Sequence, residues 1–151
     1  MTSIPTQQDA VTVRTFAQLL SPTERGARLA RRLALLQCHA WGIPYGSEAS
    51  EAVAQIVAEL AANAVTHGRV RGRCFELRLV QLDHSTDALL RIEVSDARGG
   101  RRPPGPGTLA EPGPEADSGR GLVLVEALAD RWSVHDRAPG GKTVRAEIDL
   151  R

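Results

Sequence analysis

The residues with the clearest chemical potential are Glu59, Asn63 and His67, which recur every four positions in a run of good helix formers. At about 100° per residue, these side chains line one edge of an α-helix. The apolar stripe of the same helix is formed by Val53, Ile56, Val57, Leu60 and Ala64. The pattern therefore places a carboxylate and an amide oxygen at the border of the core, where a site for a metal and a phosphate can be built.

A loop rich in proline and glycine follows Asp96. Residues 96–118 hold five of the nine prolines and five of the fourteen glycines, with scarcely any large apolar side chain. A structureless loop of about 20 residues in a compact domain is typically either a functional lid or a disordered insertion. Behind it, Gly119-Arg120-Gly121 is expected to open a short helix over Leu122–Ala129. The unpaired N–H groups at such a helix start can converge on an anion.

The elements that must position these residues follow an α/β pattern. Two long helices are predicted, one from an N-cap at Ser21 with Pro22 at its first position to about Trp41, the other from Ser47 to Gly68. Alternating segments predict strands over residues 11–16, 74–82, 88–95, 131–135 and 142–150. The order of strands and helices favours an α+β fold, a two-layer α/β sandwich with helices on one face of a mixed, mostly antiparallel sheet.

Composition narrows the classes of function. The chain has 151 residues, 42% of them hydrophobic, and a formal net charge of +1. It is long enough for one domain with a real core, expected over residues 11–151 behind a flexible segment at 1–10. The small net charge argues against direct nucleic-acid binding. No apolar run approaches a membrane span, and the polar amino terminus lacks a signal-peptide pattern, so a cytoplasmic protein is expected.

The two cysteines, Cys38 and Cys74, have no metal-type spacing. We expect both to be reduced, packed thiols. Gly141-Lys142-Thr143 resembles the end of a P-loop, but that motif needs glycine at the place of Asp136 and a following helix, so we reject it.

Three segments together carry a family resemblance. Glu59-x-x-x-Asn63 with His67, the strand ending at Asp96, and Gly119-Arg120-Gly121-Leu122 after the lid resemble the N, G1 and G2 boxes of the Bergerat-fold (GHKL) histidine kinase-like ATPase superfamily. Within it, the chain is most similar to small single-domain regulators related to the bacterial anti-sigma-factor serine kinases of actinomycetes. The likeness covers about residues 28–147. It implies the Bergerat fold, with ATP and Mg²⁺ bound under a lid at about residues 97–118.

The resemblance also assigns roles. Asn63 would be the Mg²⁺ ligand, Glu59 the catalytic base and Asp96 the reader of the adenine amino group. The phosphates would lie against Ser118, Gly119, Arg120, Gly121 and Leu122. Gly100 keeps the second glycine of the G1 box, whereas Arg98 stands where the family usually has the first.

Three neighbouring residues have less definite roles. By the same resemblance, Thr143 would touch a phosphate, with Lys142 as a nearby surface charge. His67 could contact the nucleotide or cap the end of its helix, and the sequence does not decide between these.

Two functions from different classes follow. One is an ATP-dependent protein serine/threonine kinase whose partner is a sigma factor or an anti-sigma-factor antagonist. The alternative is a non-catalytic nucleotide-binding adaptor whose lid signals ATP to a partner. A sensor histidine kinase is disfavoured, because no paired-helix segment precedes His39.

The resemblance is also compatible with a homodimer. Arg25, Arg28, Arg31 and Arg32 form a basic helix face, which is either solvated or a partner-docking surface.

Overall fold

A computed structural model describes residues 10–98, 117–138 and 140–150 of the protein. Along these residues the elements follow the order β1 (Thr12–Leu20), α1 (Glu24–Ala40), α2 (Glu48–Thr66), β2 (Phe75–Asp83), β3 (Ala88–Asp96), α3 (Asp117–Leu128), β4 (Arg131–Arg137) and β5 (Gly141–Asp149). This is the predicted sequence of strands and helices. The expected lid falls outside the described residues, except for its two ends.

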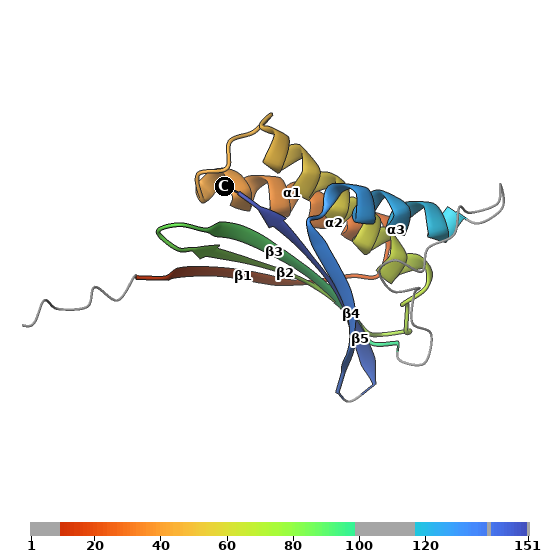
Figure 1. The fold of residues 1–151 in the computed structure, drawn as a ribbon. Helices are drawn as coiled ribbons and strands as arrows, with labels where there is room; N and C mark the ends of the chain where they lie inside the picture. The colour runs from red at the N-terminus through yellow and green to blue at the C-terminus, as the bar shows by residue number, and fades with distance from the viewer. Residues whose placement is uncertain (1–9, 99–116, 139, 151) are drawn as a thin grey trace, which may run out of the picture.

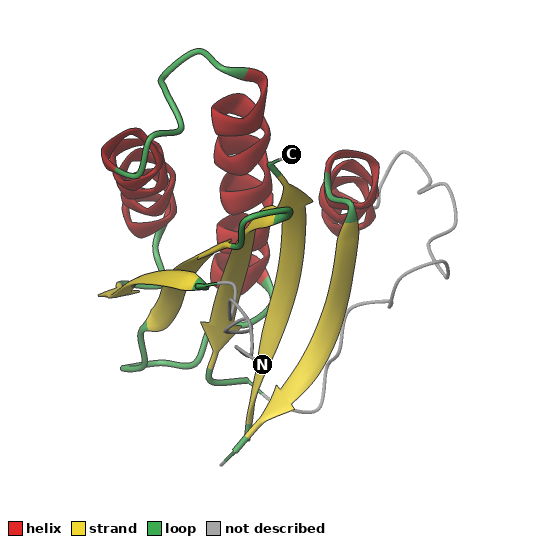
Figure 2. Ribbon diagram, turned by 60° about the vertical axis from the view of Figure 1, so that its left-hand side comes forward, coloured by secondary structure: helices red, strands yellow, loops and turns green. Residues whose placement is uncertain are grey.

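The strands form one sheet in the order β1-β2-β3-β5-β4. All three helices lie on the same face of this sheet, with α2 between α1 and α3 (Figure 1, Figure 2). The predicted two-layer α+β sandwich is therefore confirmed. Each strand pairing is antiparallel, so the sheet is antiparallel throughout instead of mixed.

Helix α2 is the centre of the helical layer, and its sequence explains where it begins and ends. The side chain of Ser47 caps its start by accepting a hydrogen bond from the Ser50 N–H at 3.2 Å. Glu48 and Glu51 lie in the first turn, where their charge complements the helix dipole. The predicted apolar stripe is buried in the core: Val53, Ile56, Val57, Leu60 and Ala64. The start at Ser47 and the end near Gly68 are confirmed.

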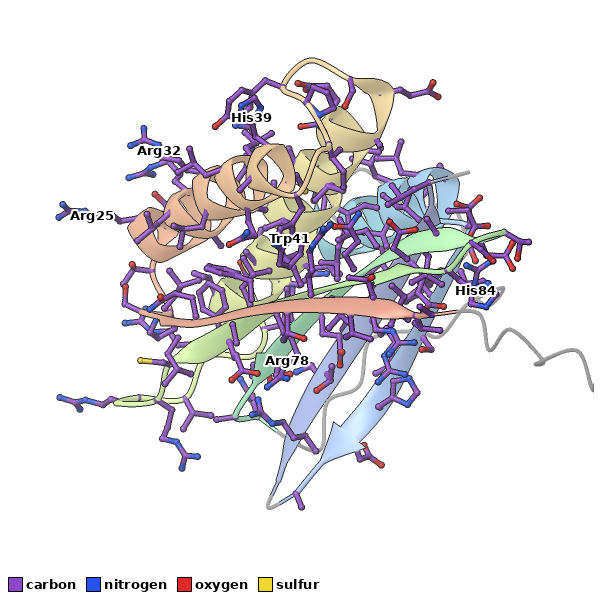
Figure 3. All side chains as sticks on the ribbon, turned by 90° about the vertical axis from the view of Figure 1, so that its left-hand side faces the viewer. Arg25, Arg32, His39, Trp41, Arg78 and His84 are labelled. Carbon is purple, nitrogen blue, oxygen red and sulfur yellow. The ribbon has the colours of Figure 1, made fainter. Side chains whose placement is uncertain are left out.

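The two faces of the sheet differ sharply. Alternate residues of β2, β3 and β5 are buried under the helices: Leu77, Leu79, Leu90, Ile92, Val144 and Ala146. The opposite face, which we call the outer face, carries ion pairs such as Arg91 to Glu147 at 2.9 Å and Arg145 to Glu93 at 3.4 Å. Arg78 lies on this face, away from the helices (Figure 3). The strand period of two thus decides which side chains can meet the helices.

Two predicted helix starts were wrong. Helix α1 begins at Glu24 with Thr23 as N-cap, because the Thr23 hydroxyl accepts the Gly26 N–H at 3.0 Å. The Ser21 carbonyl instead accepts the Thr23 N–H, so the turn precedes the helix. Helix α3 begins at Asp117, not Leu122, and the glycines expected just before the helix lie within its first turns.

Candidate nucleotide-binding site

The site is organised around the exposed edge of α2, and Glu59 lies where this helix meets α3. Glu59 is half-buried, and a methyl group at Gly121 would lie only 2.5 Å from its Oε2 atom. Glycine at position 121 therefore lets α3 approach the carboxylate closely. No residue that the structure describes forms a hydrogen bond or ion pair with the Glu59 side chain. The carboxylates of Glu93 and Glu147, by contrast, are neutralised by arginines on the outer face.

Asn63 lies one turn further along α2 and is half-buried. Its backbone carbonyl accepts the N–H groups of His67 at 2.8 Å and Gly68 at 3.2 Å, which closes the helix. Its side-chain amide forms no hydrogen bond with the described residues. His67 is the C-cap residue of α2.

Asp96 ends β3 on the helix-covered face and belongs to a buried ion pair. Lys142 at the start of β5 is its direct partner across the strands, and the Lys142 Nζ lies 2.9 Å from Oδ2 and 3.1 Å from Oδ1. The Arg98 N–H also donates to Oδ1 at 2.9 Å. Burial raises the pKa of Asp96 above its usual value, and the hydrogen bonds and charge of Lys142 counter part of that rise.

Gly68, at the end of α2, packs closely against the side chain of Asp96. A methyl group there would overlap the Asp96 carboxylate, so only glycine permits the observed approach. The carboxylate is thereby held between the last turn of α2 and the first residues of β5. Asp96 and Asn63 consequently belong to one region, joined through the residues that end α2.

The first turns of α3 hold the G2-box residues. Because the helix begins at Asp117, the backbone N–H groups of Ser118, Gly119 and Arg120 belong to its first four and have no partner within the helix. Such a helix start can receive an anion. Leu122, by contrast, is a core residue with 2% exposure. Gly100 lies outside the described residues.

Thr143 lies on the opposite face of the sheet from Asp96 and from helix α2, which carries Glu59 and Asn63. It points to the outer face, where its hydroxyl lies 2.6 Å from that of Ser95. The reason is the strand period, because Val144 beside it belongs to the core under the helices. The same alternation buries Lys142, which is 5% exposed and not the surface charge predicted from the sequence.

A pocket of about 410 Å³ opens at the same end of the sheet. Its lining includes Arg73, Glu76, Ser95, Asp96 and Arg137, and neither Glu59 nor Asn63 contributes to it. The pocket therefore shares Asp96 with the candidate site but does not reach Glu59 or Asn63.

Sequence reasoning therefore missed two residues that shape the site. Gly68 was recognised only as a helix end, and Lys142 only as a surface charge. Counting back two residues from the apolar Val144 would have placed Lys142 on the inner face. No local signal distinguishes Gly68 as a contact of Asp96, because the contact joins residues that are distant in the sequence.

Residues 21–148 match the family described as the histidine kinase-like ATPase domain. The chain belongs to this family. The match covers both long helices and the whole sheet except β1 and the end of β5. Among curated proteins, none matches the sequence.

A histidine kinase-like ATPase domain binds ATP, and the arrangement of α2 and α3 is consistent with that ligand. The inter-helix approach at Gly121 leaves the Glu59 carboxylate and the start of α3 on adjoining elements. In the part of the chain that the structure describes, no helix is long and apolar enough to span a membrane.

The protein atoms that could act as metal ligands decide whether the site suits Mg²⁺. The described residues contain no group of three His, Cys, Asp or Glu side chains suited to hold a metal ion. Mg²⁺ commonly binds through one or two protein oxygens and completes its shell with phosphates and water. The side-chain amide oxygen of Asn63 fits that requirement, and the ATP-binding domain needs no larger protein cage.

Proposed function

We propose that this histidine kinase-like ATPase domain is an ATP- and Mg²⁺-binding regulatory protein that phosphorylates a serine or threonine of a protein partner. One observation carries the proposal. Glu59 presents a carboxylate without a described partner at the junction of α2 and α3, one helical turn from the side-chain amide of Asn63. The half-buried carboxylates of Glu93 and Glu147, by contrast, are paired with arginines.

Each candidate site residue would have a separate role in phosphoryl transfer. Glu59 would accept the proton of the attacking hydroxyl, Asn63 would supply a metal ligand, and the N–H groups at the start of α3 would hold phosphate oxygens. Asp96 would accept a hydrogen bond from the adenine amino group. Bound Mg²⁺ supplies charge neutralisation at the phosphates.

The partner class comes from the resemblance to anti-sigma-factor kinases, so we propose a sigma factor or an anti-sigma-factor antagonist. Helix α1 supports a protein-docking role. Arg25 and Arg32 point away from the rest of the molecule (Figure 3), and the exposed Leu29 and Leu36 lie on the same stripe of the helix. Arginines interleaved with exposed leucines suit a partner that has acidic and apolar side chains together.

The experiment uses protein that co-purifies with the native chain as the phosphate acceptor. Transfer of label from the γ-phosphate of ATP is measured for wild type, E59Q and E51Q. Glu51 lies in the first turn of the same helix and is exposed, so E51Q controls for the loss of a carboxylate on α2.

Removing a general base typically costs about 10²–10⁴-fold in rate, so E59Q should bind ATP like wild type but lose transfer by that factor. E51Q should transfer normally. Transfer by E59Q at the wild-type rate would remove Glu59 as the base. ATP binding without transfer by the wild type is the result that the adaptor function predicts.

We also propose that the chain forms a homodimer through β1. This strand pairs with β2 alone among the described strands, so no described strand covers its other edge, and its exposed side chains include Val13 at 57% and Leu19 at 61%. Open apolar edges favour pairing with another strand. Light scattering should give twice the monomer mass for wild type and for V123K, a matched change on α3, but the monomer mass for V13K. A monomeric wild type would refute the dimer.

A further inference from the structure

Lys142 is the single lysine of a chain that otherwise uses arginine for its basic side chains. It is 5% exposed, in a position where the sheet is covered by helices. Burying an ammonium group carries a substantial desolvation cost, which an apolar side chain of similar length would avoid. A buried lysine here therefore calls for an explanation in terms of what it contacts.

The ammonium group of Lys142 donates two hydrogen bonds, to Asp96 Oδ1 and to the Arg98 carbonyl, and also lies in ion-pair contact with Asp96 Oδ2. This group has three donors, and three acceptors lie within reach: Asp96 Oδ2 at 2.9 Å, Asp96 Oδ1 at 3.1 Å and the Arg98 carbonyl at 3.2 Å. Lys142 thus contacts both oxygens of the Asp96 carboxylate. It also donates to the backbone carbonyl of Arg98, two residues further along the chain.

The same contacts limit what Asp96 can still accept. Oδ1 receives hydrogen bonds from Lys142 and from the Arg98 N–H, which occupies both of its lone pairs. Oδ2 lies 2.9 Å from the Lys142 Nζ within the ion pair and packs against Gly68. Among the contacts of the described residues, Oδ2 is therefore the carboxylate oxygen that can still accept a hydrogen bond.

Purine bases differ in the number of donors that they offer a carboxylate. Guanine presents its N1–H and N2 amino group side by side, which pairs with both oxygens of a carboxylate. Adenine presents one amino group beside the N1 acceptor. With Lys142 in place, Asp96 can serve the adenine amino group but not the paired donors of guanine.

We propose that Lys142 is the specificity-determining residue of the base subsite: it occupies Oδ1 of Asp96 so that the carboxylate can accept from a base through Oδ2 but not through both oxygens, which selects adenine over guanine. This rests on the proposed function to the extent that Asp96 is taken to read the base. The selectivity resides in the Asp96–Lys142 pair and not in Glu59 or Asn63.

Calorimetric titration of ATP and GTP into the full chain tests the proposal, with the variants K142T, K142R and R145T. Threonine has one donor and frees at least one carboxylate position, whereas the arginine fork can occupy both oxygens. Arg145 is the cation of the same strand that points to the outer face, so R145T is the matched control.

Wild type, K142R and R145T should bind ATP at least about tenfold more tightly than GTP, a typical minimum for a hydrogen-bonding mismatch in a buried site. In K142T the ratio of the GTP dissociation constant to the ATP dissociation constant should fall about tenfold, mainly through tighter GTP binding. An unchanged ratio in K142T, or equal binding of both nucleotides by wild type, would overturn the role of Lys142. Failure of wild type to bind either nucleotide would instead overturn the proposed function as a whole.

A ligand series keeps the test independent of the variant's folding. Diaminopurine riboside triphosphate keeps the 6-amino donor and the N1 acceptor, whereas inosine triphosphate has N1–H and a 6-oxo group. Wild type should bind the first nearly as well as ATP. Inosine lacks the 2-amino group of guanine and offers the carboxylate one donor, so inosine triphosphate should bind more tightly than GTP. Equal binding of inosine triphosphate and GTP would contradict the proposal that guanine is rejected because one of its paired donors finds no acceptor.

Discussion

Replacing Gly68 by alanine is the sharpest test of the geometry around Asp96. The new methyl group would overlap the carboxylate of Asp96, which is pinned by Lys142 and by the Arg98 N–H. Gly68 does not have a positive φ, so the overlap and not backbone strain determines the effect.

The magnitude follows from the two ways in which the overlap can be relieved. If the carboxylate moves, a buried ion pair is broken, which costs about 3–5 kcal/mol. If the backbone shifts and the pair survives, the cost resembles overpacking, about 1–3 kcal/mol. We therefore expect the free energy of unfolding to fall by about 2–4 kcal/mol, or the melting temperature by roughly 5–15 °C in a chain of this size.

Gly121→Ala is the matched comparison, because its methyl group would meet the tip of Glu59, a side chain that no described residue holds. Rotating that side chain costs about 0.5–1.5 kcal/mol. Alanine in place of glycine within a helix returns about 0.5–1 kcal/mol. The free energy of unfolding of G121A should thus stay within about 1 kcal/mol of wild type.

Urea denaturation followed by circular dichroism measures both variants. The expected result is a large loss for G68A and little change for G121A. If G68A is as stable as wild type, or if the two variants lose equal stability, the argument that Asp96 is immobilised by Lys142 fails.

Two further predictions concern residues outside the site. Burial raises the pKa of the Cys38 thiol to about 11, while Cys74 is exposed, so a thiol reagent at neutral pH should label one cysteine in the folded protein and both in urea. Two labelled thiols without urea would contradict this. Burial tends to raise the pKa of Glu147, but hydrogen bonds from Arg91 and Arg131 outweigh it and leave the pKa below its ordinary 4.5. The stabilisation of the folded state by these Glu147 contacts is therefore present above about pH 4.5 and is lost as the pH falls through the lowered pKa. The difference in the free energy of unfolding between wild type and R131M should consequently narrow in acid. A gap of constant size between pH 7 and pH 3 would refute the assignment.

Local patterns were sufficient for much of the fold. The apolar stripe and Ser47 cap predicted α2, and period-two alternation predicted the hairpin of β2 and β3, because these signals depend on neighbouring residues only. Boundaries were less predictable. Ser21 and Thr23 both suit an N-cap, and the geometry of the preceding turn decided for Thr23.

In the candidate site, too, some features follow from local sequence and others depend on packing. The sequence by itself determined the edge of α2 that carries Glu59 and Asn63, since helical spacing fixes side chains that are four residues apart. It could not determine what faces that edge. Gly121 and Glu59 are 62 positions apart (121 − 59), and their approach depends on how α3 packs against α2.

The tertiary structure alone decided the state of Asp96. Its partner Lys142 is 46 positions away, and strand register sets both their pairing and the face they share. The same register turned Thr143 to the outer face. A sequence specifies residue types and local periods, whereas register and helix packing arise from the whole core. Those long-range terms therefore decided whether Asp96 presents a free carboxylate or one already held by a cation.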